Sequence, residues 1–127
     1  MHGAKHKGSP PTEPFGEIMG KAEAALAEGD HVQAERLFGQ ATVAQPASAS
    51  AWHGKGRAFV AQKAWDKALR CFSVAVKFDP KHADAFAARA EVWQHLGDAA
   101  KARADVEALA GLDPGHAELG RLRGLVG

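Results

Sequence analysis

The sequence has no tyrosine, one cysteine and no long hydrophobic run. The single cysteine, Cys71, cannot form an internal disulfide, and no cysteine pair exists for a thiolate zinc site. No apolar stretch approaches the ~20 residues of a transmembrane helix. The basic N-terminus is also not followed by the apolar segment of a secretory signal. These absences predict a soluble chain without membrane insertion, located in the cytoplasm.

Excess charge is absent too. Sixteen Lys and Arg residues stand against fifteen Asp and Glu residues, a net charge of +1. Because Lys5, Lys7 and Glu13 precede Phe15, the rest of the chain holds 14 residues of each sign. Proteins that bind nucleic acid through its phosphates need a local excess of Lys and Arg. The composition therefore predicts no nucleic-acid partner.

The chain does have alanine, 28 of its 127 residues. Alanine has the highest helix propensity, and its small side chain lets helix backbones approach closely. A length of 127 residues allows one small domain. The expectation is a single all-α domain.

Three prolines, Pro46, Pro80 and Pro114, recur at equal intervals along the chain. This period divides the chain into three units that can be aligned. The units are 15–48, 49–82 and 83–116. Their columns agree: position 20 is always alanine, position 8 is always small, and positions 4, 11 and 24 are mostly large and apolar. Examples are Ala34, Ala68 and Ala102 at position 20, and Phe38, Phe72 and Val106 at position 24.

This pattern resembles the tetratricopeptide repeat family, whose period of about 34 residues it matches. The resemblance covers residues 15–116. Unit two has every expected residue type: Trp52, Gly56, Phe59, Ala68, Phe72, Ala75 and Pro80. Position 7 departs from the family's leucine, being Lys21, Lys55 and Arg89. The resemblance implies a right-handed α-solenoid of three antiparallel helix hairpins. About three such hairpins are needed before the stack is stable.

Helix ends follow from local signals. Gly29-Asp30 and Gly97-Asp98 supply a glycine that ends one helix and an aspartate that caps the next. Unit two has Lys63 and Ala64 there, which leaves Asp66 as the candidate cap. The expected helices are 15–28, 31–44, 49–62, 65–78, 83–96 and 99–112.

The two ends of the chain differ. Residues 1–14 contain three prolines and almost no large apolar residues, which predicts a disordered tail. Residues 117–127 place Leu119, Leu122 and Leu125 at a spacing of three. We expect this segment to form a capping helix with the three leucines facing inward.

The seven histidines do not form a metal site by spacing. His82 and His116 fall in turns and are expected to be exposed, while His31 occupies a packing column. His53 and His95 should lie roughly 12 Å apart along neighbouring helices, too far to share a metal. No metal or other cofactor is therefore expected.

Catalytic motifs are likewise missing. Cys71 is expected to be an inert, partly buried thiol. Gly54 and Gly56 have no strand before them, so they do not form a phosphate loop. No serine has a recognisable base beside it. The sequence predicts that the protein is not an enzyme.

The resemblance implies that the first helix of each unit lines a concave groove that binds peptide segments of partner proteins. Carried over position by position, the expected groove residues are Met19, Gly20, Glu23, Leu26, Ser50, His53, Gly54, Arg57, Val60, Asp84, Ala87, Ala88, Glu91, Gln94 and Arg121. Gly16, Ala27, Ala61, His95, Glu118 and Leu122 belong to the same faces.

Position 6 of the repeats forms a stripe of small residues in the expected groove, which either admits a ligand backbone or reflects alanine-rich composition. Position 9 and the cap alternate in charge, which indicates either a mixed-charge ligand or self-neutralising salt bridges. Lacking tyrosine, the groove is also expected to have few aromatic anchors.

One subset of the family binds acidic chaperone tails through a clamp of Lys, Asn and Arg residues. The matching places here hold Met19, Glu23, Gly54, Asp84 and Ala88, none of which fits. We therefore expect no binding of acidic Glu-Glu-Val-Asp tails.

The leading hypothesis is a non-catalytic adaptor that binds a peptide or helix of a partner protein. The alternatives are a chaperone that shields an apolar client segment, and a scaffold that self-assembles through its leucine-rich cap. The expected state is a monomer or a weak homo-oligomer.

Overall fold

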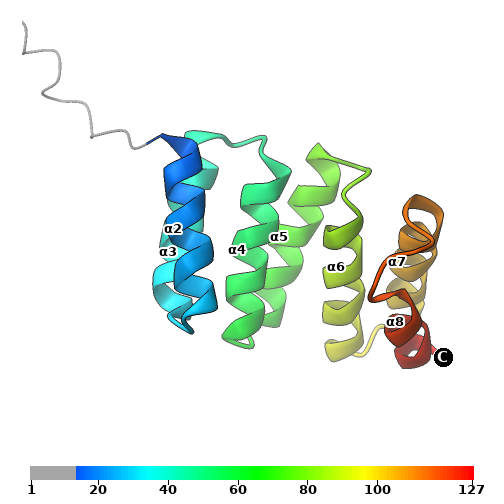
Figure 1. Cartoon of the computed structure of the whole chain (residues 1–127). Coiled ribbons are helices and arrows are strands. Elements are labelled where there is room, and N and C mark those ends of the chain that lie inside the picture. The colour runs from blue at the N-terminus through cyan, green and yellow to red at the C-terminus, as the bar shows by residue number, and fades with distance from the viewer. Residues whose placement is uncertain (1–13) are drawn as a thin grey trace, which may run out of the picture.

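A computed structural model of the chain describes residues 14–127, and these residues form helices without strands. Figure 1 shows the helices side by side, from α2 at one end to α8 at the other. They are α2 (Phe15–Ala27), α3 (His31–Ala44), α4 (Ala49–Ala61), α5 (Trp65–Phe78), α6 (Ala83–His95), α7 (Ala99–Leu112) and α8 (Leu119–Val126). The expected all-α fold is confirmed. The tail predicted over residues 1–14 lies, except for Pro14, outside the described residues.

The helices form two layers of a solenoid. Each hairpin packs its two helices together, α2 with α3, α4 with α5 and α6 with α7. The first helices also contact one another, from α2 through α4 and α6 to α8, whereas within residues 14–127 no such contact joins α3, α5 and α7. Helices on the inside of a curved stack lie closer together than those on the outside. The layer α2, α4, α6 and α8 is therefore the inner, concave one. None of the described helices is long and apolar enough to span a membrane.

Glycine and aspartate set the helix boundaries in the first and third hairpins, as expected. Gly29 and Gly97 both have φ of +83°, a conformation that glycine adopts without the steric cost of a Cβ atom. The carboxylate of Asp30 accepts from the Gln33 N–H at 3.2 Å, and that of Asp98 from the Lys101 N–H at 3.0 Å. Each aspartate thus caps the helix that follows it.

The second hairpin turns differently from the prediction. Asp66 lies within the first turn of α5 and is not its cap, and the N-cap position is held by Ala64, which offers no side-chain oxygen. Lys63 stands at the position that glycine holds in the other two hairpins, and its φ is +58°. A residue with a Cβ atom is strained in this left-handed region.

Replacing Lys63 by glycine should therefore stabilise the chain. We expect the free energy of unfolding to rise by about 0.5–1 kcal/mol because the strain at positive φ is removed. Urea denaturation of K63G measures the change. Lys63→Ala is the control, since alanine keeps the Cβ atom, and an equal gain in that variant would show that the backbone strain is not the cause.

The core follows the repeat columns. Ala34, Ala68 and Ala102 are fully buried, and Phe38, Phe72 and Val106 lie at or near full burial beside them. The hairpin helices approach closely because the facing residues are small: Ala22 and Ala90 are fully buried, and Gly56 lies under the ring of Phe72. The prediction that positions 8 and 20 are small for packing is confirmed.

A buried ion pair explains the basic residue at position 7 of the third repeat. The Arg89 guanidinium donates two hydrogen bonds of 2.8 Å to the carboxylate of Asp105 on α7, and a third of 3.3 Å to Ser73 Oγ on α5. The side chain of Asp105 is only 6% exposed and that of Arg89 is 20% exposed. A polar clamp between three helices thus takes the place of the leucine that the family pattern expects.

Helix α8 covers the end of the stack, but not with the three leucines predicted. Leu119 and Leu122 are buried, whereas Leu125 is 43% exposed and Val126 packs against the cluster instead. At 100° per residue, Val126 returns to the face of Leu119 after seven steps, while Leu125 at six steps does not. A spacing of three residues therefore places Leu125 away from the buried face of α8.

Candidate binding groove

The inner layer carries an apolar pocket between the second and third repeats, which we call the anchor pocket. It has a volume of about 220 Å³. Its walls come from α4, α5 and α6. The lining residues are Arg57, Val60, Trp65, Phe72, Ala88, Glu91, Val92 and His95.

Two aromatic residues in this pocket were not predicted. Trp65 and Phe72 belong to the second helix of their repeat, so a carry-over confined to first helices omits them. The Trp65 indole stacks on the His95 imidazole, with ring centroids 3.9 Å apart and planes 7° from parallel. The expectation of a groove with few aromatic anchors thus left out these two side chains, which line the pocket. The repeat columns contained the signal, because Trp65 and Phe72 occupy apolar columns of the repeat.

A second, more polar hollow adjoins the anchor pocket and shares Arg57, Ala88 and Glu91 with it. We call it the charged hollow, and its volume is about 310 Å³. It extends from α4 across α6 to the start of α8. Its lining residues are His53, Arg57, Asp84, Ala87, Ala88, Glu91, His116, Glu118 and Arg121. Together the two hollows form one groove along the inner face of repeats two and three.

The charges that alternate along the sequence pair with one another across helices. The Arg57 guanidinium contacts the Glu23 carboxylate at 2.9 Å, with side chains 39% and 47% exposed. Arg121 contacts both Glu91 at 3.0 Å and Glu118 at 2.6 Å. Exposed pairs of this kind contribute about 0–1 kcal/mol each to stability. These pairs therefore occupy the charged side chains of the groove while contributing little to stability.

Two histidines expected to be exposed in turns are instead engaged. His116 Nε2 lies 2.6 Å from Asp84 Oδ1, and the His116 side chain is only 11% exposed. His82 Nδ1 accepts from the Ala85 N–H at 3.1 Å and so caps α6. Asparagine and aspartate are the usual caps, which is why the pattern did not indicate this role. The hydrogen bond from His116 is the main cause that lowers the pKa of Asp84.

His53 lines the charged hollow and contacts two other rings. Its ring centroid is 4.9 Å from that of His82 and 5.8 Å from that of Phe72. Burial, together with the nearby His82 and Arg57, lowers the pKa of His53 to about 4, while Asp84 acts in the opposite direction. His53 is therefore neutral at pH 7 in the folded chain.

This lowered pKa predicts a loss of stability in mild acid. An unfolded histidine takes up a proton below about pH 6.5, whereas His53 in the folded chain does so only near pH 4. The stabilisation is present above pH 6.5 and falls between pH 6.5 and 4, by about 2–3 kcal/mol in total. Urea denaturation across this pH range, compared with His53→Gln, measures it. Parallel curves for the two proteins would contradict the assignment.

Some predicted groove residues have other roles. Gly54 is buried, and a Cβ atom built on it would overlap Phe38 Cε1, so its small size serves packing and not ligand approach. Gln94 Nε2 donates to the Leu125 carbonyl at 3.0 Å and ties α8 to α6. Met19 and Leu26 pack partly buried on the core of the first hairpin. Gly20 and Ser50 are exposed on the inner helices.

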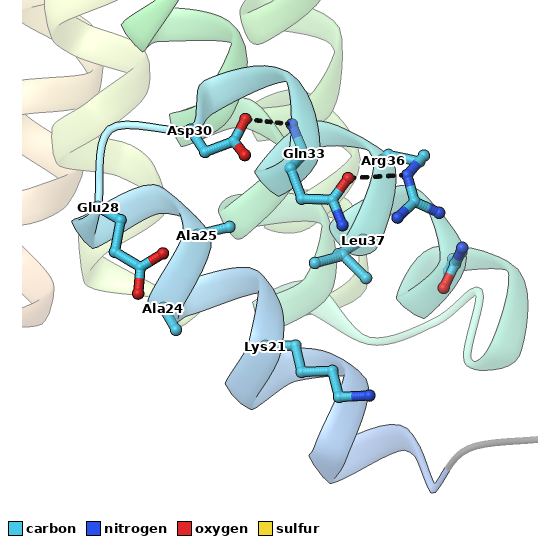
Figure 2. Close-up of a pocket in the computed structure, with 9 residues that line it drawn as sticks. Lys21, Ala24, Ala25, Glu28, Asp30, Gln33, Arg36 and Leu37 are labelled. Carbon is cyan, nitrogen blue, oxygen red and sulfur yellow. Dashed lines mark hydrogen bonds between the residues drawn. The ribbon is translucent and has the colours of Figure 1, made fainter.

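Another hollow lies between α2 and α3 in the first hairpin and has a volume of about 440 Å³. Figure 2 shows the residues that line it. Ala24 and Glu28 line it, and they stand one repeat before Ala58 and Gln62, which pack against α3 in the next repeat. The face that packs on α3 in the second repeat thus lines a hollow in the first. Most of its other lining is polar, including Asp30, Gln33 and Arg36, whose hydrogen bonds are drawn.

Two observations concern the metal-binding and nucleophilic side chains of the described part of the chain. Among residues 14–127, no three histidine, cysteine or acidic side chains gather in a way that could hold a metal ion. Cys71 is buried, and burial raises the pKa of its thiol to about 11. A thiol so rarely ionised is a poor nucleophile, in agreement with the expected structural role.

The arrangement of helical hairpins with an inner groove defines a class of repeat proteins that present an extended surface. Models of the tetratricopeptide repeat match residues 19–83 and 55–127. The chain therefore belongs to the tetratricopeptide repeat family. No curated protein shows a significant sequence match to it.

Solved structures share the fold at low sequence identity. The Sgt2 tetratricopeptide domain from Aspergillus fumigatus is similar with a TM-score of 0.86 and 20% identity, over 91% of this chain and 78% of that one. The first tetratricopeptide domain of Spaghetti, bound to an HSP90 peptide, is similar with a TM-score of 0.84 and 19% identity, over 87% of this chain and 91% of that one. The type III secretion translocator chaperone SycD of Yersinia enterocolitica is similar with a TM-score of 0.82 and 18% identity, over 88% of this chain and 80% of that one.

Proposed function

We propose that the chain is a non-catalytic protein-interaction module that binds a peptide or helix of a partner protein in its inner groove. The observation that carries this proposal is the continuity of the anchor pocket with the charged hollow. Apolar anchoring beside polar selection is the usual organisation of a peptide-binding surface. The similarity to a Spaghetti domain bound to a peptide agrees with this use of the fold.

A chaperone role is the second candidate. The similarity to the chaperone SycD and the apolar lining of the anchor pocket favour it. A chaperone of this kind would bind an apolar helix of its client and keep the client soluble. The two functions use the same groove, and they differ in whether the partner precipitates when the chain is removed.

Substitutions in the groove test the proposal. Val60→Glu places a carboxylate in the anchor pocket, and Ala88→Leu fills part of its volume. We expect both to weaken partner capture on immobilised protein by about 10-fold or more, as loss of a central contact does. Glu107 is exposed on α7, so Glu107→Lys is the control and should capture the partner as the wild type does. If both groove variants retain the partner as wild type does, the groove is not the binding site.

A further inference from the structure

The anchor pocket has room for one large side chain. A cavity of roughly 150 Å³ admits a benzene ring, and this pocket measures about 220 Å³. Val60, Trp65, Phe72 and Val92 give it apolar walls, and Arg57 and Glu91 are the charged residues of its lining. A phenylalanine, leucine or methionine side chain therefore matches it in size and polarity.

The charged hollow beside the pocket carries an excess of negative charge. Its lining contains three carboxylates, those of Asp84, Glu91 and Glu118, against the guanidiniums of Arg57 and Arg121. Both arginines are already bound to carboxylates, Arg57 to one and Arg121 to two. The cations of the groove are thus engaged, and the acidic groups outnumber them.

Asp84 is the most available of these acidic groups. Its side chain is 66% exposed, and its hydrogen-bond partner is the imidazole of His116 in place of an arginine. That hydrogen bond lowers the pKa of Asp84, so the group stays ionised at neutral pH. The imidazole occupies Oδ1, which leaves the second carboxylate oxygen to accept from a ligand.

We propose that the ligand of the groove is a partner segment that combines one large apolar side chain with a neighbouring lysine or arginine. This inference rests on the proposed function and specifies its ligand. The apolar side chain enters the anchor pocket, and the cation binds Asp84 between α6 and α8. An acidic segment is rejected, because its carboxylates meet Asp84, Glu91 and Glu118 while both arginines are already paired.

Selection from a displayed library of random peptides on the immobilised full chain tests the ligand chemistry directly. We expect the enriched peptides to share a large apolar residue and an excess of Lys and Arg. Their binding is then measured by fluorescence anisotropy, together with the acidic peptide SRMEEVD that the Spaghetti structure contains. Enrichment of acidic peptides, or tight binding of SRMEEVD, would overturn the proposed chemistry.

Matched variants assign each part of the ligand to its site. Asp84→Asn should weaken a selected peptide about 3- to 10-fold, while Asp66→Asn, an equivalent first-turn aspartate on α5, should leave binding unchanged. Ala88→Leu and Val60→Glu should each reduce binding about 10-fold or more by occupying the anchor pocket. Circular dichroism confirms that each variant is folded.

The outcomes separate the two proposals. If the selected peptides are acidic and their binding is lost in Ala88→Leu and Val60→Glu, the groove is the binding site but the proposed basic ligand is refuted. Peptides that bind all variants equally would refute both the groove and its ligand. Equal weakening by Asp84→Asn and Asp66→Asn would refute the role of Asp84.

Discussion

Replacing Arg89 by methionine is expected to destabilise the chain by about 3–5 kcal/mol. The substitution removes the guanidinium that donates two 2.8 Å hydrogen bonds to Asp105, whose side chain is 6% exposed. A carboxylate is then left buried without a cation. Since small domains have a total stability of only about 5–15 kcal/mol, the melting temperature should fall by roughly 10–20 °C.

Two further variants show whether the buried pair itself is responsible. Arg89→Met combined with Asp105→Leu replaces the pair by apolar side chains and should recover most of the lost stability. Glu23→Ala breaks an exposed pair and should cost less than about 1 kcal/mol. A double variant as unstable as the single one would contradict the account, because no unpaired charge remains in it.

Replacing Gly54 by alanine is expected to destabilise the chain by about 1–3 kcal/mol. Alanine has a higher helix propensity by about 1 kcal/mol, which alone would favour the variant. The added Cβ atom, however, would overlap three ring carbons of Phe38, a side chain that is fully buried and cannot easily move. The steric cost should outweigh the propensity gain, and thermal denaturation measures the difference.

The repeat supplies an internal control for this prediction. Gly20 stands one repeat earlier at the same position of α2, and a Cβ atom there meets nothing within 4 Å. Gly20→Ala should therefore stabilise the chain by about 0.5–1 kcal/mol. Phe38→Leu in the Gly54→Ala background should restore part of the loss, since the smaller side chain relieves the clash. If Gly54→Ala stabilises as Gly20→Ala does, the packing explanation is wrong.

Much of the fold was predictable because its determinants are local and repeat. A proline at the same position of every repeat ends each hairpin, and Gly29-Asp30 and Gly97-Asp98 divide two hairpins into helices. These signals act over a few residues of chain, so they can be recognised without knowing what lies opposite. Lys63 is the exception, because its left-handed conformation is imposed by the fold against its own preference.

The features that were missed depend on contacts between helices. Arg89 and Asp105 are 16 residues apart and meet only once α6 packs on α7, so position 7 looked like a mere departure from the family pattern. Gly54 looked like part of a ligand-facing stripe, and its role became clear only against the ring of Phe38. His116 reaches Asp84 across the groove from a turn that sequence alone indicated to be exposed.

For the candidate site, the family pattern predicted which face of the stack carries the groove but not all the residues that line it. First-helix positions supplied Arg57, Val60 and Ala88, which the structure brings into one groove. Trp65 was missed because it lies on the second helix of its hairpin, whereas the predicted positions were confined to first helices. Which residues line a groove depends on helix packing angles, and these are not encoded in any single column.

The central claim is that partner segments bind in the anchor pocket, and the three tryptophans allow a direct measurement. Trp65 lines the pocket, whereas the Trp52 indole N–H donates to the Pro46 carbonyl at 2.7 Å and Trp93 lies beside Lys101. In an NMR titration of the ¹⁵N-labelled chain with a selected peptide, the Trp65 indole resonance should shift while those of Trp52 and Trp93 stay in place. A bound peptide that shifts Trp52 or Trp93 and leaves Trp65 unchanged would contradict the account.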